Sequence, residues 1–273
     1  VEVPKTEVPE ELPQKTVVEH TGTGQTGGKY LWAEKVCIQN STGQSIDVTA
    51  LAEQTLNLEM GEGPQILIYH THGSEAYTQT EENRYIESDS YRTIDCERNV
   101  VRVGEEMAQV FRAQGFEVIH DTTLHDYPSY NGSYSHAAAS TKAYLEKYPT
   151  IELILDLHRD AADTPTGQMA TSCTVGGEKA AQLMFVLGTD KRLNHPDWEQ
   201  NLSLALKLQV LLEKENPGIC RDLTLSKNRY NQHLGAYALP VEIGAAGNTL
   251  EEAKIAAREL GKAIVKLVLS SEG

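Results

Sequence analysis

The chain has 273 residues, of which 40% are hydrophobic, and this length suffices for one full domain with an additional segment. Its formal net charge is −15, and the sequence contains no basic run. Proteins that bind nucleic acid need clustered Lys and Arg to neutralise phosphates, so the composition argues against that class of function.

No stretch reaches the roughly 18 consecutive apolar residues that a transmembrane helix needs. The first residues, Val1–Pro4, resemble neither a signal peptide nor a natural start, so we expect a soluble piece of a longer protein. The cysteines have no short paired spacing, which argues against a zinc ribbon and leaves their disulfide pairing open. They are Cys37, Cys96, Cys173 and Cys220.

Residues 1–29 have the composition of a flexible linker. They are rich in Pro, Glu, Thr and Gly, and the run 21–28 contains too little apolar surface to offset the entropy of ordering. Residues 30–60 contain a strand-like patch at 36–38 and a short helical pattern, and this segment is too small to fold alone. We therefore predict an N-terminal appendage over 30–60 that packs on a larger domain over 61–273.

From Pro64 onward, apolar runs alternate with helical patterns, and Gly115 is a typical helix-end signal. The predicted strands are 65–69, 116–119, 152–157, 183–187 and 238–242, and the predicted helices are about 96–114, 136–147, 197–215 and 250–269. This alternation predicts a single α/β domain with a largely parallel, twisted sheet that helices cover on both faces.

Three predicted strands end in groups that can bind a metal or transfer a proton. His70 and His72 follow the first, His158 follows another, and Glu242 ends a late strand. Ligands gather at the carboxyl ends of strands in open α/β sheets, so we expect these side chains to meet. Each also has an ordinary reading, since a strand-end His is commonly structural and Glu242 could cap a helix or pair with a Lys.

Two neutral imidazoles and one carboxylate are the ligands of a catalytic zinc site whose remaining position is open for water. Glu97 is a candidate for the carboxylate because the predicted helix places it in the first turn, where the helix dipole favours negative charge. Alternatively, Glu97 only stabilises the start of this helix and does not bind a metal.

The segment 66–75, Ile-Leu-Ile-Tyr-His-Thr-His-Gly-Ser-Glu, resembles the first metal-binding strand end of the zinc-dependent N-acetylmuramoyl-L-alanine amidases. The resemblance implies that His72, which precedes Gly, is the first ligand. It implies Glu97 and His158 as the other ligands and Glu242 as the catalytic residue. It also implies that 61–273 is the zinc amidase catalytic domain.

Further stretches resemble a sporulation branch of that family, and the similarity covers roughly residues 60–270. These stretches are 125–134, 229–232 and 247–253. One departure is His233, which stands where similar proteins carry Asp, and the role of His233 stays open.

The implied reaction is hydrolysis of the amide bond between N-acetylmuramic acid and the L-alanine of the stem peptide. Zinc on His72, Glu97 and His158 would lower the pKa of a bound water toward about 7 and polarise the scissile carbonyl. Glu242 would accept the proton of that water and deliver it to the departing amine.

Other candidates near these residues have two readings each. His70 would share a strand face with the first ligand, either as a ligand itself or as support behind it. Glu75 would hold its loop or touch substrate. Arg159 and Asp160 would orient the preceding imidazole or form a surface salt bridge. The loop 127–134 offers tyrosine rings for sugars or is simply a packed surface loop.

Two other functions remain open from the sequence. The same site could cut the peptide cross-links between stems, or the fold could be a non-catalytic cell-wall-binding module, against which the retained Glu242 argues. The resemblance implies peptidoglycan as substrate, a glycan-cleaving partner enzyme during forespore engulfment, and extracytoplasmic action with a membrane anchor upstream of Val1.

Overall fold

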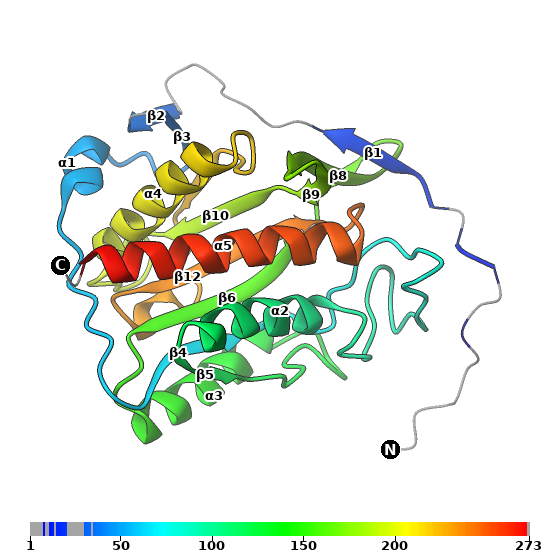
Figure 1. Ribbon diagram of the computed structural model, residues 1–273, viewed down its shortest axis with the longest axis horizontal. Helices are drawn as coiled ribbons and strands as arrows, with labels where there is room; N and C mark the ends of the chain where they lie inside the picture. The colour runs from blue at the N-terminus through cyan, green and yellow to red at the C-terminus, as the bar shows by residue number, and fades with distance from the viewer. Residues whose placement is uncertain (1–7, 9–10, 14, 21–29, 34, 272–273) are drawn as a thin grey trace.

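The computed structural model describes residues 8, 11–13, 15–20, 30–33 and 35–271. These residues form an eight-stranded sheet in the order β2-β3-β11-β10-β12-β6-β4-β5 (Figure 1). Its strands are β2 Tyr30–Ala33, β3 Val36–Asn40, β4 Pro64–Tyr69, β5 Glu117–His120, β6 Leu153–Asp160, β10 Leu183–Gly188, β11 Leu223–Ser226 and β12 Ala238–Ala245. A smaller sheet contains β1 Val17–His20, β7 Asp163–Thr164, β8 Gly167–Val175 and β9 Glu178–Ala181.

The helices are α1 Val48–Glu53, α2 Val100–Ala113, α3 Ser133–Lys147, α4 Trp198–Glu215 and α5 Leu250–Ser271, with a 3-10 turn η1 Gln232–Leu234. Helices α2, α4 and α5 contribute to the large apolar core on one face of the main sheet, whereas α3 packs in a second core on the other face. Figure 1 shows α5 running across the sheet with α2 and α4 on either side of it. No helix among the described residues is long and apolar enough to span a membrane.

The strand directions confirm the prediction of a largely parallel α/β sheet covered by helices on both faces. Strands β5, β4, β6 and β12 run parallel, as do β10, β11 and β3. Antiparallel pairs occur between β10 and β12 and between β2 and β3. Strand β6 lies between β4 and β12, so these three parallel strands bring their carboxyl ends to one edge.

The N-terminal segments take part in the sheets more than their composition predicts. Residues 17–20 form β1, which pairs in parallel with 168–171 of β8, although we expected a flexible linker over 1–29. The rest of that prediction falls largely outside the described residues. Residues 30–40 add β2 and β3 to the edge of the main sheet, where Ile38 is fully buried. The first part of the predicted appendage over 30–60 therefore extends the main sheet.

Alternation along β6 directs its polar residues to the face that carries α3. Leu153, Leu155 and Leu157 are buried in the large core with α2 and α5. Because successive side chains of a strand point to opposite faces, Asp156 and His158 point to the other side. Strand β6 is therefore buried on both faces, and Asp156 and His158 are buried polar residues on the face that carries α3.

Strand β12 repeats this arrangement beside β6. Val241 and Ile243 belong to the large core, and Glu242 between them points to the α3 side. Glu242 is the register partner of His158 on the adjacent parallel strand. The sheet itself therefore places these two side chains next to each other.

Helix α2 begins later than the sequence pattern predicts. Its N-cap is Asn99, whose side chain accepts a hydrogen bond from the backbone N–H of Val101 at 2.9 Å. The expected helix start near Cys96 was wrong because the apolar pattern does not reveal which polar residue caps the helix. Glu97 consequently lies before the helix and not in its first turn.

Candidate active site

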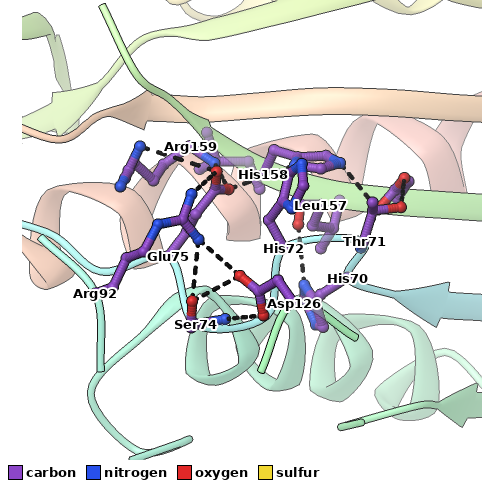
Figure 2. Close-up of polar contacts among 12 residues, drawn as sticks. His70, Thr71, His72, Ser74, Glu75, Arg92, Asp126, Leu157, His158 and Arg159 are labelled. Carbon is purple, nitrogen blue, oxygen red and sulfur yellow. Dashed lines mark hydrogen bonds and ion pairs between the residues drawn. The ribbon is translucent and has the colours of Figure 1, made fainter. Parts of the chain in front are cut away.

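Three side chains meet where β4 and β6 end (Figure 2). The imidazole rings of His72 and His158 lie 5.3 Å apart between centroids, at 70° to each other. Oε2 of Glu75 lies 3.4 Å from Nδ1 of His158. All three are at most 5% exposed, so the cluster is buried at the sheet edge.

A second carboxylate fixes the other side of the His158 ring. Oδ1 of Asp156 lies 3.1 Å from Nε2 of His158. The Asp156 carboxylate also accepts hydrogen bonds from the backbone N–H and the hydroxyl of Thr71, at 2.8 and 2.7 Å. Asp156 was not among the residues predicted from the sequence, although its spacing of two residues from His158 on a strand places both on one face.

The charges in this cluster support each other. Burial disfavours a charged His158, but the carboxylates of Asp156 and Glu75 outweigh it and hold the pKa of this imidazole well above its ordinary value. Burial would also raise the pKa of Glu75, but Arg159, His158 and His72 lower it to about 2. Without a metal, the site therefore holds an imidazolium between two carboxylates.

Glu75 is anchored by two arginines. The backbone N–H of Arg159 donates to Oε2 of Glu75 at 3.2 Å, and the guanidinium of Arg92 donates to Oε1 at 3.5 Å. The Arg159 side chain is itself held by the carbonyls of Ala76 and Tyr91, both at 3.1 Å. Of the two readings of Glu75, the structure therefore supports a buried place in the cluster itself, which sequence reasoning underestimated.

His72 is covered by tyrosines of the 127–134 loop and of α3. The ring of Tyr130 stacks on His72 at 4.5 Å and 9°, and its hydroxyl lies 3.2 Å from Nε2 of His72. Tyr134 contacts the same imidazole edge-on at 5.4 Å. Nδ1 of His72 is buried and has no hydrogen-bond partner among the described residues. Burial lowers the pKa of His72, which favours its neutral form.

The loop that carries these tyrosines is tied to the first strand end. Asp126 accepts hydrogen bonds from the backbone N–H and the hydroxyl of Ser74, at 3.1 and 2.6 Å. Arg92 donates to the same carboxylate at 2.6 Å, and its guanidinium lies 5.0 Å from the centre of the Tyr130 ring. Figure 2 shows Ser74, Arg92 and Asp126 joined in this network below Glu75. It holds the loop close to His72.

Glu242 comes from β12 and adds a carboxylate of different character. Its Oε2 atom is buried and has no hydrogen-bond partner in the described part of the chain. Burial, with the negative charges of Glu75 and Asp160, raises the pKa of Glu242 to about 8, although His158 and Arg159 oppose this effect. A carboxyl group that titrates near neutral pH can both accept and release a proton.

The structure does not bring Glu97 to this site. Its side chain is 79% exposed, and its contact within the described residues is an ion pair with Arg102 at 3.8 Å. In this structure the carboxylate beside the histidines belongs to Glu75, which lies in the turn directly after His72.

His70 and Asp160 also differ from the sequence expectations. His70 does not share a face with His72, because β4 ends at Tyr69 and the chain turns there. Nδ1 of His70 donates to the carbonyl of Leu157 at 3.0 Å, and its Nε2 lies 3.0 Å from Nε2 of His120 on β5. His70 therefore supports the backbone just before His158. Asp160 forms an ion pair with Arg221 at 2.7 Å and does not orient an imidazole.

The residue types in the cluster fit a zinc ion, which prefers imidazole nitrogens and a carboxylate oxygen. Nδ1 of His72 and Oε2 of Glu242 are both buried and have no hydrogen-bond partner among the described residues, which is consistent with a further group at the site. Within the described residues, no three His, Cys, Asp or Glu side chains already form a metal-holding cluster. The side chains of His72, Glu75 and His158 can supply the donor atoms, but they would have to rotate to enclose an ion.

Three solved structures show a similarity at low identity. The N-acetylmuramoyl-L-alanine amidase AmiC2 of Nostoc punctiforme has a TM-score of 0.44 and 10% identity, and the match covers 77% of this chain and 98% of that chain. The CwlD amidase from Clostridioides difficile, in complex with the GerS lipoprotein, has a TM-score of 0.42 and 12% identity, with 76% of this chain and 98% of that chain covered. The N-acetylmuramyl-L-alanine amidase Ami1 from Mycobacterium abscessus has a TM-score of 0.42 and 12% identity, with 77% of this chain and 99% of that chain covered. No curated protein matches the chain.

The fold and the cluster together define an α/β protein that places histidines and carboxylates at the carboxyl ends of parallel strands. The model of the family Stage II sporulation protein P (SpoIIP) matches residues 7–265, and the chain belongs to this family. Membership supports a role as a peptidoglycan hydrolase in sporulation.

Proposed function

We propose that this protein is a zinc-dependent amidase that cleaves the bond between N-acetylmuramic acid and the L-alanine of the stem peptide. The observation that carries the proposal is the convergence of His72, Glu75 and His158 with Glu242 on the adjacent strand. Two imidazoles, one ligating carboxylate and one further carboxylate are the components of a zinc hydrolase site.

The zinc would be held by His72, Glu75 and His158. Nδ1 of His158 faces Glu75, so this nitrogen and the Glu75 carboxylate can share one ion, while Nε2 stays on Asp156. A carboxylate behind a ligating imidazole fixes its orientation and increases its basicity. Nδ1 of His72 is the available nitrogen of that ring, because Nε2 is next to the Tyr130 hydroxyl.

When bound, zinc supplies a Lewis acid for the scissile carbonyl and lowers the pKa of a water toward about 7. Glu242 accepts the proton of the attacking water and returns it to the leaving amine, because an amine departs only when it is protonated. The raised pKa of Glu242, about 8 in the metal-free site, falls in the presence of a cation, so that the carboxylate form is available as a base.

Glu75 and Glu242 differ in their contacts with arginine. Arg159 and Arg92 both contact Glu75, and Arg159, with His158 and His72, lowers the pKa of Glu75 and so keeps it ionised, as a ligand must be. Glu242 has no ion pair with a residue that the structure describes, and burial raises its pKa to about 8, so this carboxyl group can gain or lose a proton near neutral pH. The different surroundings of the two carboxyl groups assign one to binding and the other to proton transfer.

The experiment is digestion of purified sacculi by the zinc-loaded protein, followed by identification of the residue that bears each new amino terminus. Release of L-alanine termini supports the amidase. New termini only at cross-linking residues would replace this proposal with an endopeptidase, and no new termini from a zinc-loaded, folded protein would refute both.

We further propose extracytoplasmic action, a membrane anchor upstream of Val1 and cooperation with a glycan-cleaving enzyme.

A further inference from the structure

A groove of about 450 Å³ lies beside the cluster and is not used by the proposed chemistry. One wall is the exposed side of α3, with Tyr134 and Lys142. The opposite wall is the loop before and within η1, with Arg229, Tyr230 and His233. We call this the basic groove. Its volume is within the range of small-ligand sites.

The basic groove is linked to the cluster through Tyr134. Tyr134 lines the groove and also contacts the His72 ring, with centroids 5.4 Å apart. The Tyr230 ring lies 5.9 Å from the Tyr134 ring, and the side-chain amide of Asn231 donates to the Tyr134 carbonyl at 2.9 Å. The two walls are thus joined at the end of the groove nearest to His72. The groove therefore begins at the Tyr134 ring that covers His72.

The charge of the groove is opposite to that of the protein. The chain carries a net charge of −15, yet no Asp or Glu is among the residues that line the groove. Lys142, Arg229 and His233 form no ion pair with any acidic residue that the structure describes. The Arg229 guanidinium donates to the Asn194 carbonyl, which leaves its other N–H groups available.

The pKa of His233 reflects the positive charges of the groove. Burial, together with the charges of Arg229, His195 and Lys142, lowers the pKa of His233 to about 4. The charge at neutral pH therefore comes from Lys142 and Arg229, with His233 as a neutral hydrogen-bonding group between them. Uncompensated cations in a protein of this composition indicate a ligand that brings negative charge.

We propose that the basic groove binds a free carboxylate of the stem peptide and so selects peptides that carry one near the scissile amide. The inference rests on the proposed amidase function and specifies the part of the substrate that the site recognises. Stem peptides bear free carboxylates close to the lactyl amide, whereas the glycan there is neutral. The aromatic faces of Tyr134 and Tyr230 suit the peptide backbone that leads to the carboxylate.

A larger hollow of about 540 Å³ does not compete with this assignment. It lies between α2 and α5 and is lined by three apolar and four polar residues, two of them lysines, and none of these residues belongs to the cluster. A ligand in that hollow would be separated from His72 by the sheet and α2, since His72 lies on the side of the sheet that carries α3.

The test compares two synthetic muramyl peptides that differ only in the second residue, which carries either a free α-carboxylate or a carboxamide. The wild-type protein should cleave the carboxylate peptide with the lower KM. Lys142→Gln and Arg229→Gln should each raise that KM by about fivefold, the effect of losing one solvent-accessible ion pair. Neither variant should change the KM for the carboxamide peptide, and kcat should stay within about twofold for both peptides.

Lys262→Gln is the matched control, because it removes the same charge from α5, where Lys262 pairs with Glu259 far from the groove. His233→Asp adds an acid to the groove and should raise the KM of the carboxylate peptide further. Lys142 is exposed on α3, so its variant tests the groove even if Arg229→Gln disturbs the loop that Arg229 holds.

Equal KM values for the two peptides, unchanged in Lys142→Gln, would overturn the inference. An equal loss for both peptides would also overturn it and assign the groove to the neutral glycan or peptide backbone. Calorimetric binding of both peptides separates the inference from the proposed function. If the zinc-loaded protein cleaves neither peptide, the amidase proposal fails, while tighter, Lys142-dependent binding of the carboxylate peptide still supports the groove.

Discussion

Oε2 of Glu75 lies 3.4 Å from Nδ1 of His158, and this pair joins the turn after β4 to the carboxyl end of β6. On this contact we propose Glu75 as the carboxylate ligand of zinc. Glu97, which the sequence pattern predicted as the ligand, lies before α2 and is 79% exposed. The two glutamates therefore provide a direct comparison of the proposed buried ligand with an exposed residue of the same type.

We predict that Glu75→Gln weakens zinc binding more than about tenfold, because even residues that only support a ligand commonly change affinity by that factor. Glu97→Gln should keep the wild-type affinity. Zinc content and competition with a chelator measure both. Unchanged affinity in Glu75→Gln together with loss in Glu97→Gln would restore the original assignment, and the melting temperature of the metal-free variants controls for folding.

The sequence predicted most of the sheet because its central strands are continuous apolar runs. It also proposed His72, His158 and Glu242 as site residues, and the structure brings them together because strand ends in a parallel sheet meet at one edge. Glu75 could not be chosen on the same basis. It lies in a turn, and only the folded chain shows that the turn directs its carboxylate back to β6.

Asp156 and the edges of the sheets show the other limits of the sequence pattern. Asp156 is flanked by Leu155 and Leu157, which belong to the large core. Its spacing of two residues from His158 indicates a shared face only once this segment is known to be a strand. Strand β1 is short and follows a polar segment. Its order comes from the backbone groups that β8 offers to it, which no local propensity encodes.

We predict that Glu242→Gln keeps zinc bound and lowers turnover by at least about 10²-fold, the lower bound for a positioned general acid–base group. The amide keeps the size of the side chain but cannot accept a proton from water. Zinc content, melting temperature and cleavage are measured on one preparation. Normal cleavage by a folded, zinc-loaded variant would contradict the role of Glu242, whereas a lower melting temperature with unchanged turnover would assign it a structural role.

Zinc binding should release a proton at neutral pH. The neighbouring carboxylates raise the pKa of His158 well above 6.5, so the imidazole is protonated in the metal-free protein and zinc must displace that proton. Affinity should therefore fall as the pH is lowered and continue to rise above pH 6.5. Calorimetry in two buffers of different ionisation enthalpy counts the protons. Asp156→Asn should reduce the release, and a release of zero in the wild type would contradict this ionisation state.

Gly104 on α2 tests the support behind the site. A Cβ at this position would come within 2.7 Å of the His70 ring and 2.8 Å of Nε2 of His120. Gly104→Ala should therefore lower the free energy of unfolding by about 1 kcal/mol or more, since overpacking outweighs the better helix propensity of Ala. Gly61→Ala is the control, because a Cβ at Gly61 meets nothing within 4 Å. Urea denaturation of the metal-free proteins measures both, and equal stability of the two variants would contradict the tight packing.

The last prediction concerns β1 and replaces the expectation that all of 1–29 is dispensable linker. Residues 17–20 pair with β8, and Lys15 forms an ion pair with Glu87 and lies 3.9 Å from the centre of the Tyr91 ring. Deletion of 1–29 should therefore lower the melting temperature, because β8 loses a strand partner.

Deletion of residues 1–11 is the matched control and should leave the melting temperature unchanged, since β1 and Lys15 both remain. Turnover per folded molecule should be the same in both deletions, because His72, Glu75, His158 and Glu242 all lie far along the chain from this segment. Differential scanning calorimetry and sacculus digestion on the same samples provide the two readouts. Equal melting temperatures in the two deletions would show that β1 adds nothing to stability, and loss of turnover in the folded longer deletion would place part of the active site in residues 12–29.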